Sequence, residues 1–202
     1  MVTNTFIIFA KKISCVTSKD LTVYKYLCDE RKIPRDTVRL LLEKGLIYQE
    51  WSDHIVFVNY DKTSFQVRAT YDQFGDGRKI ISSGRTTPDR FWYFMTGKDA
   101  DTVYICEGAI DAISLYELLG RKHAFYISMG GVSNQAVIDR VVKDGKCKVV
   151  LCVDNDDDAG QKCRDRNPGL DVMIPPSPYK DWNEMLQAGA TLDDTSYMRQ
   201  VG

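Results

Sequence analysis

The sequence predicts an α/β fold: a four-stranded parallel sheet flanked by helices over residues 101–202, preceded by a small α+β subdomain over residues 1–100. Three observations predict this fold. Apolar runs of strand length alternate with helical patterns from Asp101 onward, which is typical of βαβ units. Two helical patterns, followed by short strands, lie N-terminal to Asp101. The 202 residues, 44% of them hydrophobic, are enough to build a sizeable core.

The first half reads as two helices followed by an antiparallel sheet. Apolar residues at helical spacing predict a helix over 20–31, and a second helix is delimited by Pro34 near its start and Gly45 at its end. Beyond Gly45 the pattern changes to strands. We expect strands over residues 55–58 and 64–71, joined by a turn over 59–62, with glycines at 75–77 ending the second strand.

The second half alternates between strands and helices. We expect strands over residues 102–106, 124–128, 148–153 and 170–174. We expect helices over residues 109–119, 134–143 and 159–166. In an open parallel sheet, ligands bind beyond the carboxyl ends of the strands. Residues that directly follow these strands are therefore the first candidates for a functional site.

Charge is unevenly distributed along the chain. Residues 1–100 contain 16 Lys and Arg against 12 Asp and Glu, whereas residues 101–202 contain 11 against 16. This asymmetry favours phosphate contacts in the first half and cation binding in the second, although chance scatter of surface charge is an equal alternative. The six cysteines include no CxxC pair and only two histidines are present, so no zinc pattern is formed and we expect reduced core cysteines.

The apolar run over residues 6–10 is too short to cross a membrane, and Lys11 and Lys12 follow it without a signal-peptide layout. The sequence therefore predicts a cytoplasmic protein with no membrane partner.

Carboxylates follow two of the predicted strands. Glu107 comes directly after the first strand, and Asp154 and Asp156 follow the third in the stretch VVLCVDNDDDAG. If these strands are neighbours, the three side chains converge, and hard oxygen ligands with few histidines favour Mg²⁺, with Mn²⁺ as a substitute. The alternative is an acidic loop that caps the next helix, which is the role that we assign to Asp157.

A glycine pair, Gly130 and Gly131, follows the second predicted strand and precedes a helix. Backbone amides at such a place can cradle a phosphate. A simple tight turn is the alternative.

The segments 107–112 (EGAIDA) and 153–160 (VDNDDDAG), each after an apolar strand, resemble the two signature motifs of the Toprim domain of primases, topoisomerases and some nucleases. The segment 180–184 (KDWNE) is similar to a third, primase-like element. The resemblance implies a Rossmann-type parallel sheet. It implies that Glu107 is a general acid/base or metal-proximal carboxylate and that Asp154 and Asp156 are Mg²⁺ ligands. It also implies that Asp181 is an outlying acid near a second metal and that Asp111 orients a ligand. For Asp111, satisfying backbone donors in the first helical turn is the alternative.

The segments 26–34 (YLCDERKIP), 45–49 (GLIYQ) and 54–58 (HIVFV) resemble an uncharacterised domain that precedes Toprim in many plasmid and integrative-element proteins. The layout of this half is also similar to the N-terminal subdomain of primase cores. That resemblance implies contacts to template and nucleotide phosphates. The candidate residues are Arg68, Lys79, Arg85 and Arg90, with Lys180 in the second half.

Together the resemblances imply Mg²⁺-dependent nucleotidyl or phosphoryl transfer on nucleic acid by a primase-like protein of a mobile element or replication system. The expected partners are single-stranded DNA and nucleotides, with a separate helicase or relaxase. A Toprim-type nuclease that hydrolyses phosphodiesters is one alternative. A nucleic-acid-binding adaptor without catalysis is another.

Overall fold

The computed structural model describes residues 21–50, 53–71, 81–85, 87–155, 159–192 and 198–199. The chain forms two compact units, residues 1–86 and 87–202. The division lies before the expected boundary at residue 100, because strand β5 (Trp92–Met95) pairs with a strand of the second unit.

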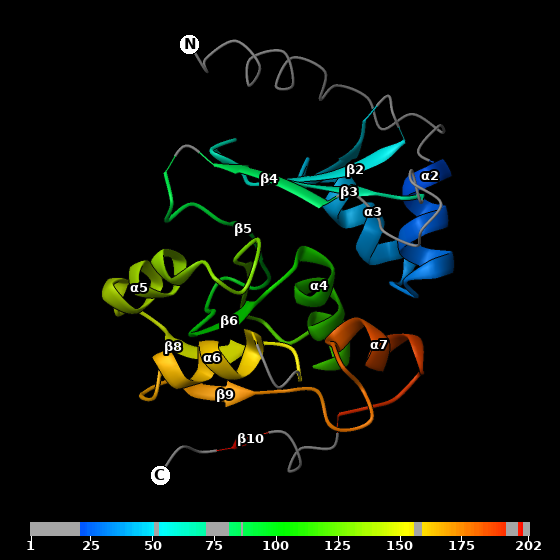
Figure 1. Cartoon of the computed structure of the whole chain (residues 1–202). Helices are drawn as coiled ribbons and strands as arrows, with labels where there is room; N and C mark the ends of the chain where they lie inside the picture. Colours follow the sequence, from blue (N-terminus) through cyan, green and yellow to red (C-terminus); the bar gives the residue numbers. More distant parts are fainter. Residues whose placement is uncertain are drawn as a thin grey trace. The chain divides into compact units, whose positions relative to one another are not determined.

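The first unit combines helices with a four-stranded antiparallel sheet of order β1-β2-β3-β4 (Figure 1). Its helices are α2 (Leu21–Tyr24), η1 (Lys25–Glu30) and α3 (Arg35–Glu43). Its strands are β1 (Ile47–Gln49), β2 (His54–Val58), β3 (Ser64–Ala69) and β4 (Ile81–Arg85). Both predicted helices and both predicted strands are present, and the glycines at 75–77 lie outside the described residues.

Sequence reasoning missed β1 and β4. β1 has three residues, and β4 reads ISSGR, which has almost no apolar character. Pairing with β3 defines β4: Gly84 lies opposite Phe65, whose ring occupies the space that a side chain at Gly84 would need. A cross-strand contact of this kind leaves no periodic signal.

The second unit contains a six-stranded sheet of order β10-β9-β8-β6-β7-β5. Its inner strands are β6 (Thr102–Cys106), β7 (Phe125–Ser128), β8 (Lys148–Cys152) and β9 (Asp171–Met173). These four pair in parallel, which confirms the predicted sheet. β5 and β10 (Met198–Arg199) add antiparallel edges that were not expected.

Helices cover both faces of this sheet (Figure 1). They are α4 (Ala109–Leu118), α5 (Gln135–Asp144), α6 (Ala159–Arg166) and α7 (Trp182–Gln187). On one face, Ile105 and Leu151 belong to a buried cluster with Val137 of α5 and Cys163 of α6. On the other face, Tyr126 stacks on Tyr104 and meets Tyr116 of α4 edge-on. The odd and even positions of each strand thus pack on different helices, as expected for a buried parallel strand.

Helix α7 was not predicted, and it packs on α4. The Nδ2 atom of buried Asn183 donates to the Oγ atom of buried Ser114 at 2.9 Å. In the described part of the chain, no helix is long and apolar enough to span a membrane.

Candidate active site

Glu107 and Asp154 lie side by side at the carboxyl edge of the second sheet. β6 and β8 are neighbours, with Cys106 in register with Cys152, so both strands end at the same edge. The Asp154 backbone N–H donates to the Oε1 atom of Glu107 at 3.2 Å. Both residues are half-buried, and the Oδ1 atom of Asp154 is shielded from solvent. The two strand ends thus bring Glu107 and the Asp154 peptide together, whereas Asp156, the third acid of the predicted site, lies outside the described residues, and the shared cation site stays a prediction.

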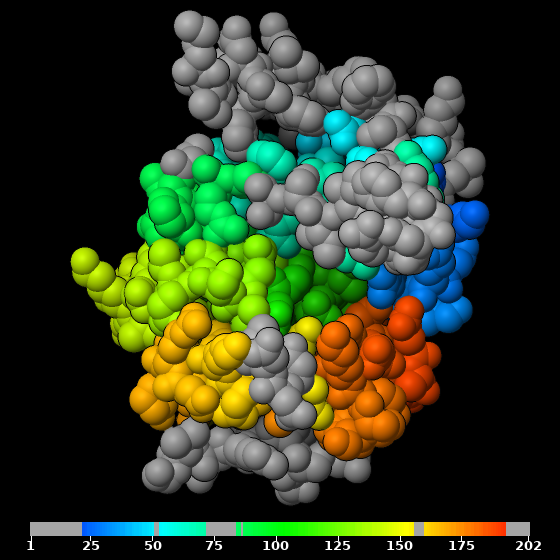
Figure 2. Space-filling model, viewed as in Figure 1, coloured from blue at the N-terminus to red at the C-terminus, as the bar shows by residue number. Residues whose placement is uncertain are grey.

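The peptide that carries Asp154 is fixed from several sides. Arg164 on α6 donates from Nη1 to the Asp154 carbonyl at 3.2 Å and from Nη2 to Gln161 at 2.7 Å. The Asn155 N–H donates to the Lys180 carbonyl at 2.7 Å. In Figure 2 the segment of α6 is gold and that of α7 is orange, and both contribute to the surface seen in this view. Arg164 was not among the predicted site residues, because a single arginine on a helix has no spacing that relates it to a strand end.

The Glu107 peptide is fixed by the loop after β7. The amides of Gly130 and Gly131 each donate to the Glu107 carbonyl at 3.1 Å, and the Ser128 hydroxyl donates to it at 3.2 Å. Both glycines have positive φ angles of 70° and 123°, which a residue with a side chain adopts only with strain. These amides position the Glu107 peptide, which agrees with the tight-turn alternative, and phosphate binding by this loop stays a prediction.

Asp111 lies in the first turn of α4 and its carboxylate lies against Gly108. A Cβ atom at Gly108 would be 2.9 Å from the Oδ2 atom of Asp111. The Gly108 backbone, at φ −115° and ψ 160°, is accessible to any residue. Glycine is therefore suited to this position by the close approach of the Asp111 carboxylate rather than by backbone conformation.

Two thiols of the second unit, those of Cys106 and Cys163, are buried. Burial raises the pKa of Cys106, and the neighbouring Cys152 thiol and the charges of Asp111 and Asp154 raise it further. Burial raises the pKa of Cys163 to about 11, with Glu107 as the next contributor. Like charges nearby disfavour a thiolate, so both thiols stay protonated near neutral pH.

The third predicted element takes a structural role in the described geometry. Asp181 caps α7, because its Oδ1 atom accepts from the Glu184 N–H at 2.7 Å, and Glu184 accepts in return from the Lys180 N–H at 2.8 Å. Such reciprocal capping satisfies donors at a helix start. The bond between Asn155 and Lys180 nevertheless holds this segment beside the end of β8.

A divalent cation in a protein needs several oxygen, nitrogen or sulfur ligands that face one point. Among the described residues, no group of three or more His, Cys, Asp and Glu side chains is arranged to hold a metal ion. Asp156 and Asp157 lie outside the described residues. Mg²⁺ commonly takes one or two protein carboxylates together with waters and substrate phosphates. Glu107 and Asp154 fit that mode, and the full set of acidic ligands stays a prediction.

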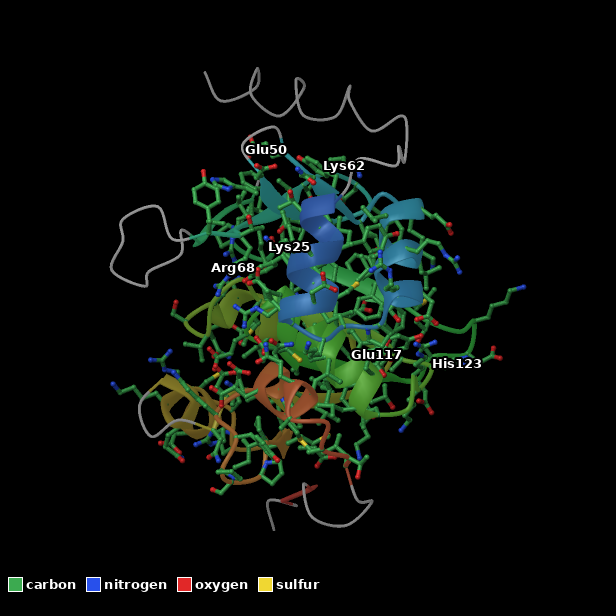
Figure 3. All side chains as sticks on the ribbon, turned by 90° about the vertical axis from the view of Figure 1, so that its right-hand side faces the viewer. Lys25, Glu50, Lys62, Arg68, Glu117 and His123 are labelled. Carbon is green, nitrogen blue, oxygen red and sulfur yellow. The ribbon has the colours of Figure 1, made fainter. Side chains whose placement is uncertain are left out.

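The predicted basic residues divide between the units. In the first unit, Arg68 lies beside the helix that carries Lys25 (Figure 3) and donates from Nε to the Tyr26 hydroxyl at 2.9 Å. Arg85, on β4 opposite Ser64, is half-buried. In the second unit Arg90 is half-buried and Lys180 is exposed, whereas Lys79 lies outside the described residues. Their phosphate contacts stay predictions.

Comparison with known proteins relates both units to described families. Residues 104–186 match the family described as Toprim-like. Residues 25–93 match a family described as a protein of unknown function, DUF3991. No curated protein matched the chain.

Three solved structures share the fold. The primase fragment of the bacteriophage T7 primase-helicase protein has a TM-score of 0.58 at 21% identity, covering 80% of this chain and 69% of its own. The second structure contains bacteriophage T7 lagging-strand DNA polymerase interacting with primase domains bound to an RNA/DNA hybrid and dTTP. One of its chains has a TM-score of 0.54 at 22% identity, and the match covers 80% of this chain and 84% of that chain. The RNA polymerase domain of Mycobacterium tuberculosis primase DnaG, in complex with double-stranded DNA, has a TM-score of 0.55 at 13% identity, covering 90% and 74%.

Proposed function

We propose that this chain, in which residues 104–186 form a Toprim-like domain within a primase-like fold, catalyses Mg²⁺-dependent nucleotidyl transfer on nucleic acid. The observation that carries the proposal is the pairing of Glu107 with Asp154 at the ends of adjacent parallel strands. Two carboxylates held at the ligand-binding edge of an α/β sheet are suited to phosphate chemistry with a hard cation.

Each residue of the pair has a distinct role in this proposal. The Asp154 carboxylate would hold the cation, with Asp156 as the second ligand predicted from the sequence. Glu107 takes the proton of the attacking hydroxyl group, because its own peptide and its Oε1 atom are positioned by backbone donors. When bound, Mg²⁺ would supply the positive charge that neutralises the transferring phosphate.

The remaining residues position this pair and contact the substrate. Arg164 fixes the Asp154 peptide, and the Asp111 carboxylate lies against Gly108, next to Glu107. We assign substrate phosphates to the predicted basic side chains, which are Arg68, Lys79, Arg85, Arg90 and Lys180. The proposed substrates are single-stranded DNA and nucleotides, in a replication system of a mobile element with a separate helicase or relaxase.

Primer synthesis tests this proposal. In one reaction, the chain is incubated with a single-stranded DNA template, labelled nucleotides and Mg²⁺ or Mn²⁺. In a parallel reaction, it is incubated with a labelled oligonucleotide and the metal, but without nucleotides. The products of both reactions are separated by length. We expect new labelled products that depend on the metal and on template. Shortening of the labelled oligonucleotide would instead identify the nuclease alternative. Neither activity, together with metal-independent binding of the oligonucleotide, would identify the adaptor.

A further inference from the structure

The segment that begins α7 contacts the chain on either side of Asp154. The Nε1 atom of Trp182, the first residue of α7, donates to the Cys152 carbonyl at 3.1 Å. The carbonyl of Lys180, two residues earlier, accepts from the Asn155 N–H at 2.7 Å. Asp154 therefore lies between two residues that are each bonded to this segment.

The bond from Trp182 is made at the end of β8. Pairing of β8 with β9 covers Val150 and Leu151, and Cys152 is the next and last residue of β8. Cys152 and Trp182 are both fully buried, so the Cys152 carbonyl is shielded from water. Because a buried carbonyl without a donor costs free energy, this bond holds the indole ring and the strand end together. Trp182 thus fixes the peptide from which the chain continues to Asp154.

Asn183 makes a second connection, to the helix that follows Glu107. Its Nδ2 atom donates to the Oγ atom of Ser114 on α4 at 2.9 Å, and both residues are buried. Helix α4 begins at Ala109, two residues after Glu107. Apolar contacts alone would let two helices slide along each other, whereas a buried hydrogen bond fixes one position because a shift breaks it inside the protein. Asn183 therefore fixes α7 against the helix that follows Glu107.

We propose that Trp182 and Asn183 are positioning residues of the candidate active site. Helix α7 has six residues and little stability of its own, so its tertiary contacts decide where it lies. Its first side chain bonds to the strand end that leads to Asp154, and its second bonds to the helix that follows Glu107. Through these two bonds α7 joins the segments that carry the two acids and limits their relative movement. Both residues are buried, so they act through these segments, and their effect on catalysis rests on the proposed function.

Amide hydrogen exchange tests this positioning without metal or substrate. Trp182→Phe keeps an aromatic ring and removes the donor to the Cys152 carbonyl. We expect the amides of Asp154 and Asn155 to exchange about 10-fold faster than in the wild-type chain, relative to the amide of Ile105 in the core of β6, because local opening of the strand end becomes easier.

Tyr126→Phe is the matched control. The hydroxyl of buried Tyr126 donates to the Lys122 carbonyl at 2.9 Å, so this variant also removes one side-chain donor to a carbonyl. The bond lies at the amino end of β7, which is the opposite edge of the same sheet. We expect the Asp154 and Asn155 amides to behave as in the wild-type chain. Exchange of these two amides that changes no more in Trp182→Phe than in Tyr126→Phe would overturn the proposal.

Mn²⁺ binding, measured by EPR, connects the positioning to the proposed function. We expect Trp182→Phe and Asn183→Leu each to lower Mn²⁺ affinity by about 10-fold, and Tyr126→Phe to leave it unchanged. Asn183→Leu combined with Ser114→Ala should lose no more than Asn183→Leu alone, because both substitutions remove the same bond. Additive losses would overturn the role of Asn183. A wild-type chain that binds no Mn²⁺ would contradict the proposed function, while hydrogen exchange would still decide the positioning.

A measurement on the unchanged chain covers the case in which a variant fails to fold. Exchange of the Trp182 indole N–H and of the Asn155 amide is followed in the wild-type chain at increasing urea concentration. We expect both protons to exchange through one opening event, with the same free energy and the same dependence on urea. An indole N–H that exchanges while the Asn155 amide stays protected would show that Trp182 does not hold the end of β8, and would overturn the proposal.

Discussion

The Asp154 backbone N–H donates a 3.2 Å hydrogen bond to the Oε1 atom of Glu107, which joins the ends of two adjacent parallel strands. This bond orients the Glu107 carboxylate from the same peptide that carries the Asp154 side chain. Substitution of either carboxylate should therefore affect chemistry without removing the contact between the strand ends.

Asp154→Asn should reduce nucleotidyl transfer by at least about 100-fold, because it removes a charged metal ligand. The variant keeps the size of the side chain and relieves repulsion with Glu107, so its melting temperature without metal should stay level or rise. Primer synthesis, Mn²⁺ binding by EPR and thermal unfolding measure the three quantities. Asp165→Asn, an exposed position on α6, is the control. An unstable but active Asp154→Asn variant would show that the carboxylate is structural.

Glu107→Gln should lower the rate of nucleotidyl transfer by about 10²- to 10⁴-fold, as expected for the loss of a general base. The glutamine carbonyl still accepts the Asp154 N–H, so unfolding should be unchanged. Mn²⁺ affinity should fall less than in Asp154→Asn, because we assign proton transfer to Glu107. Equal losses of Mn²⁺ affinity in the two variants would instead make Glu107 a primary ligand.

Gly108→Ala tests the position of the Asp111 carboxylate. The added methyl group would lie 2.9 Å from Asp111 Oδ2, so the flexible carboxylate must move while the backbone stays. We expect a severalfold loss of primer synthesis and a change in unfolding free energy within about 1 kcal/mol. Gly169→Ala is the matched control, since nothing lies within 4 Å of its Cβ position. Wild-type activity in both variants would exclude a role for Asp111.

Arg164→Gln should weaken Mn²⁺ binding by about 10-fold, because residues that orient metal ligands commonly contribute at this level. The variant loses the donor that fixes the Asp154 carbonyl. Arg164→Lys keeps a donor and should recover part of the affinity. Arg166→Gln, an exposed arginine on the same helix, removes the same charge and serves as the control. Equal losses of Mn²⁺ affinity in Arg164→Gln and Arg166→Gln would show that Arg164 acts only through its charge and not through its bond to the Asp154 carbonyl.

Asp181 can be tested as a cap and as a metal ligand with two substitutions. Asp181→Ala should lower the unfolding free energy by about 1 kcal/mol, because it removes the acceptor for the Glu184 N–H. Asp181→Asn keeps an acceptor, so stability should be nearly unchanged and most activity should be retained. Denaturant unfolding and primer synthesis provide the measurements. A stable Asp181→Asn variant with no activity would restore Asp181 as a ligand of a second cation.

The sequence by itself determined the parallel sheet and the placement of its acidic residues. Apolar runs at 102–106 and 148–153 are strong strand signals, and the carboxyl ends of parallel strands share an edge, so the sequence placed Glu107 and Asp154 at one edge of the sheet. That the two strands are neighbours came from the structure. The start and end of the second helix were also predicted from single residues, Pro34 and Gly45. Such features depend on periodicity and on a few start and stop residues, which a single sequence displays.

Only the tertiary structure decided which backbone and side-chain groups meet at the site. The amides of Gly130 and Gly131 donate to the Glu107 carbonyl, and Arg164 donates to the Asp154 carbonyl. Arg31 and Arg68 both donate to the Tyr26 hydroxyl. These contacts join residues from different elements, and their geometry depends on strand register and helix placement. Hydrogen bonds form within a few tenths of an ångström of their preferred length, and no spacing along a chain encodes that precision.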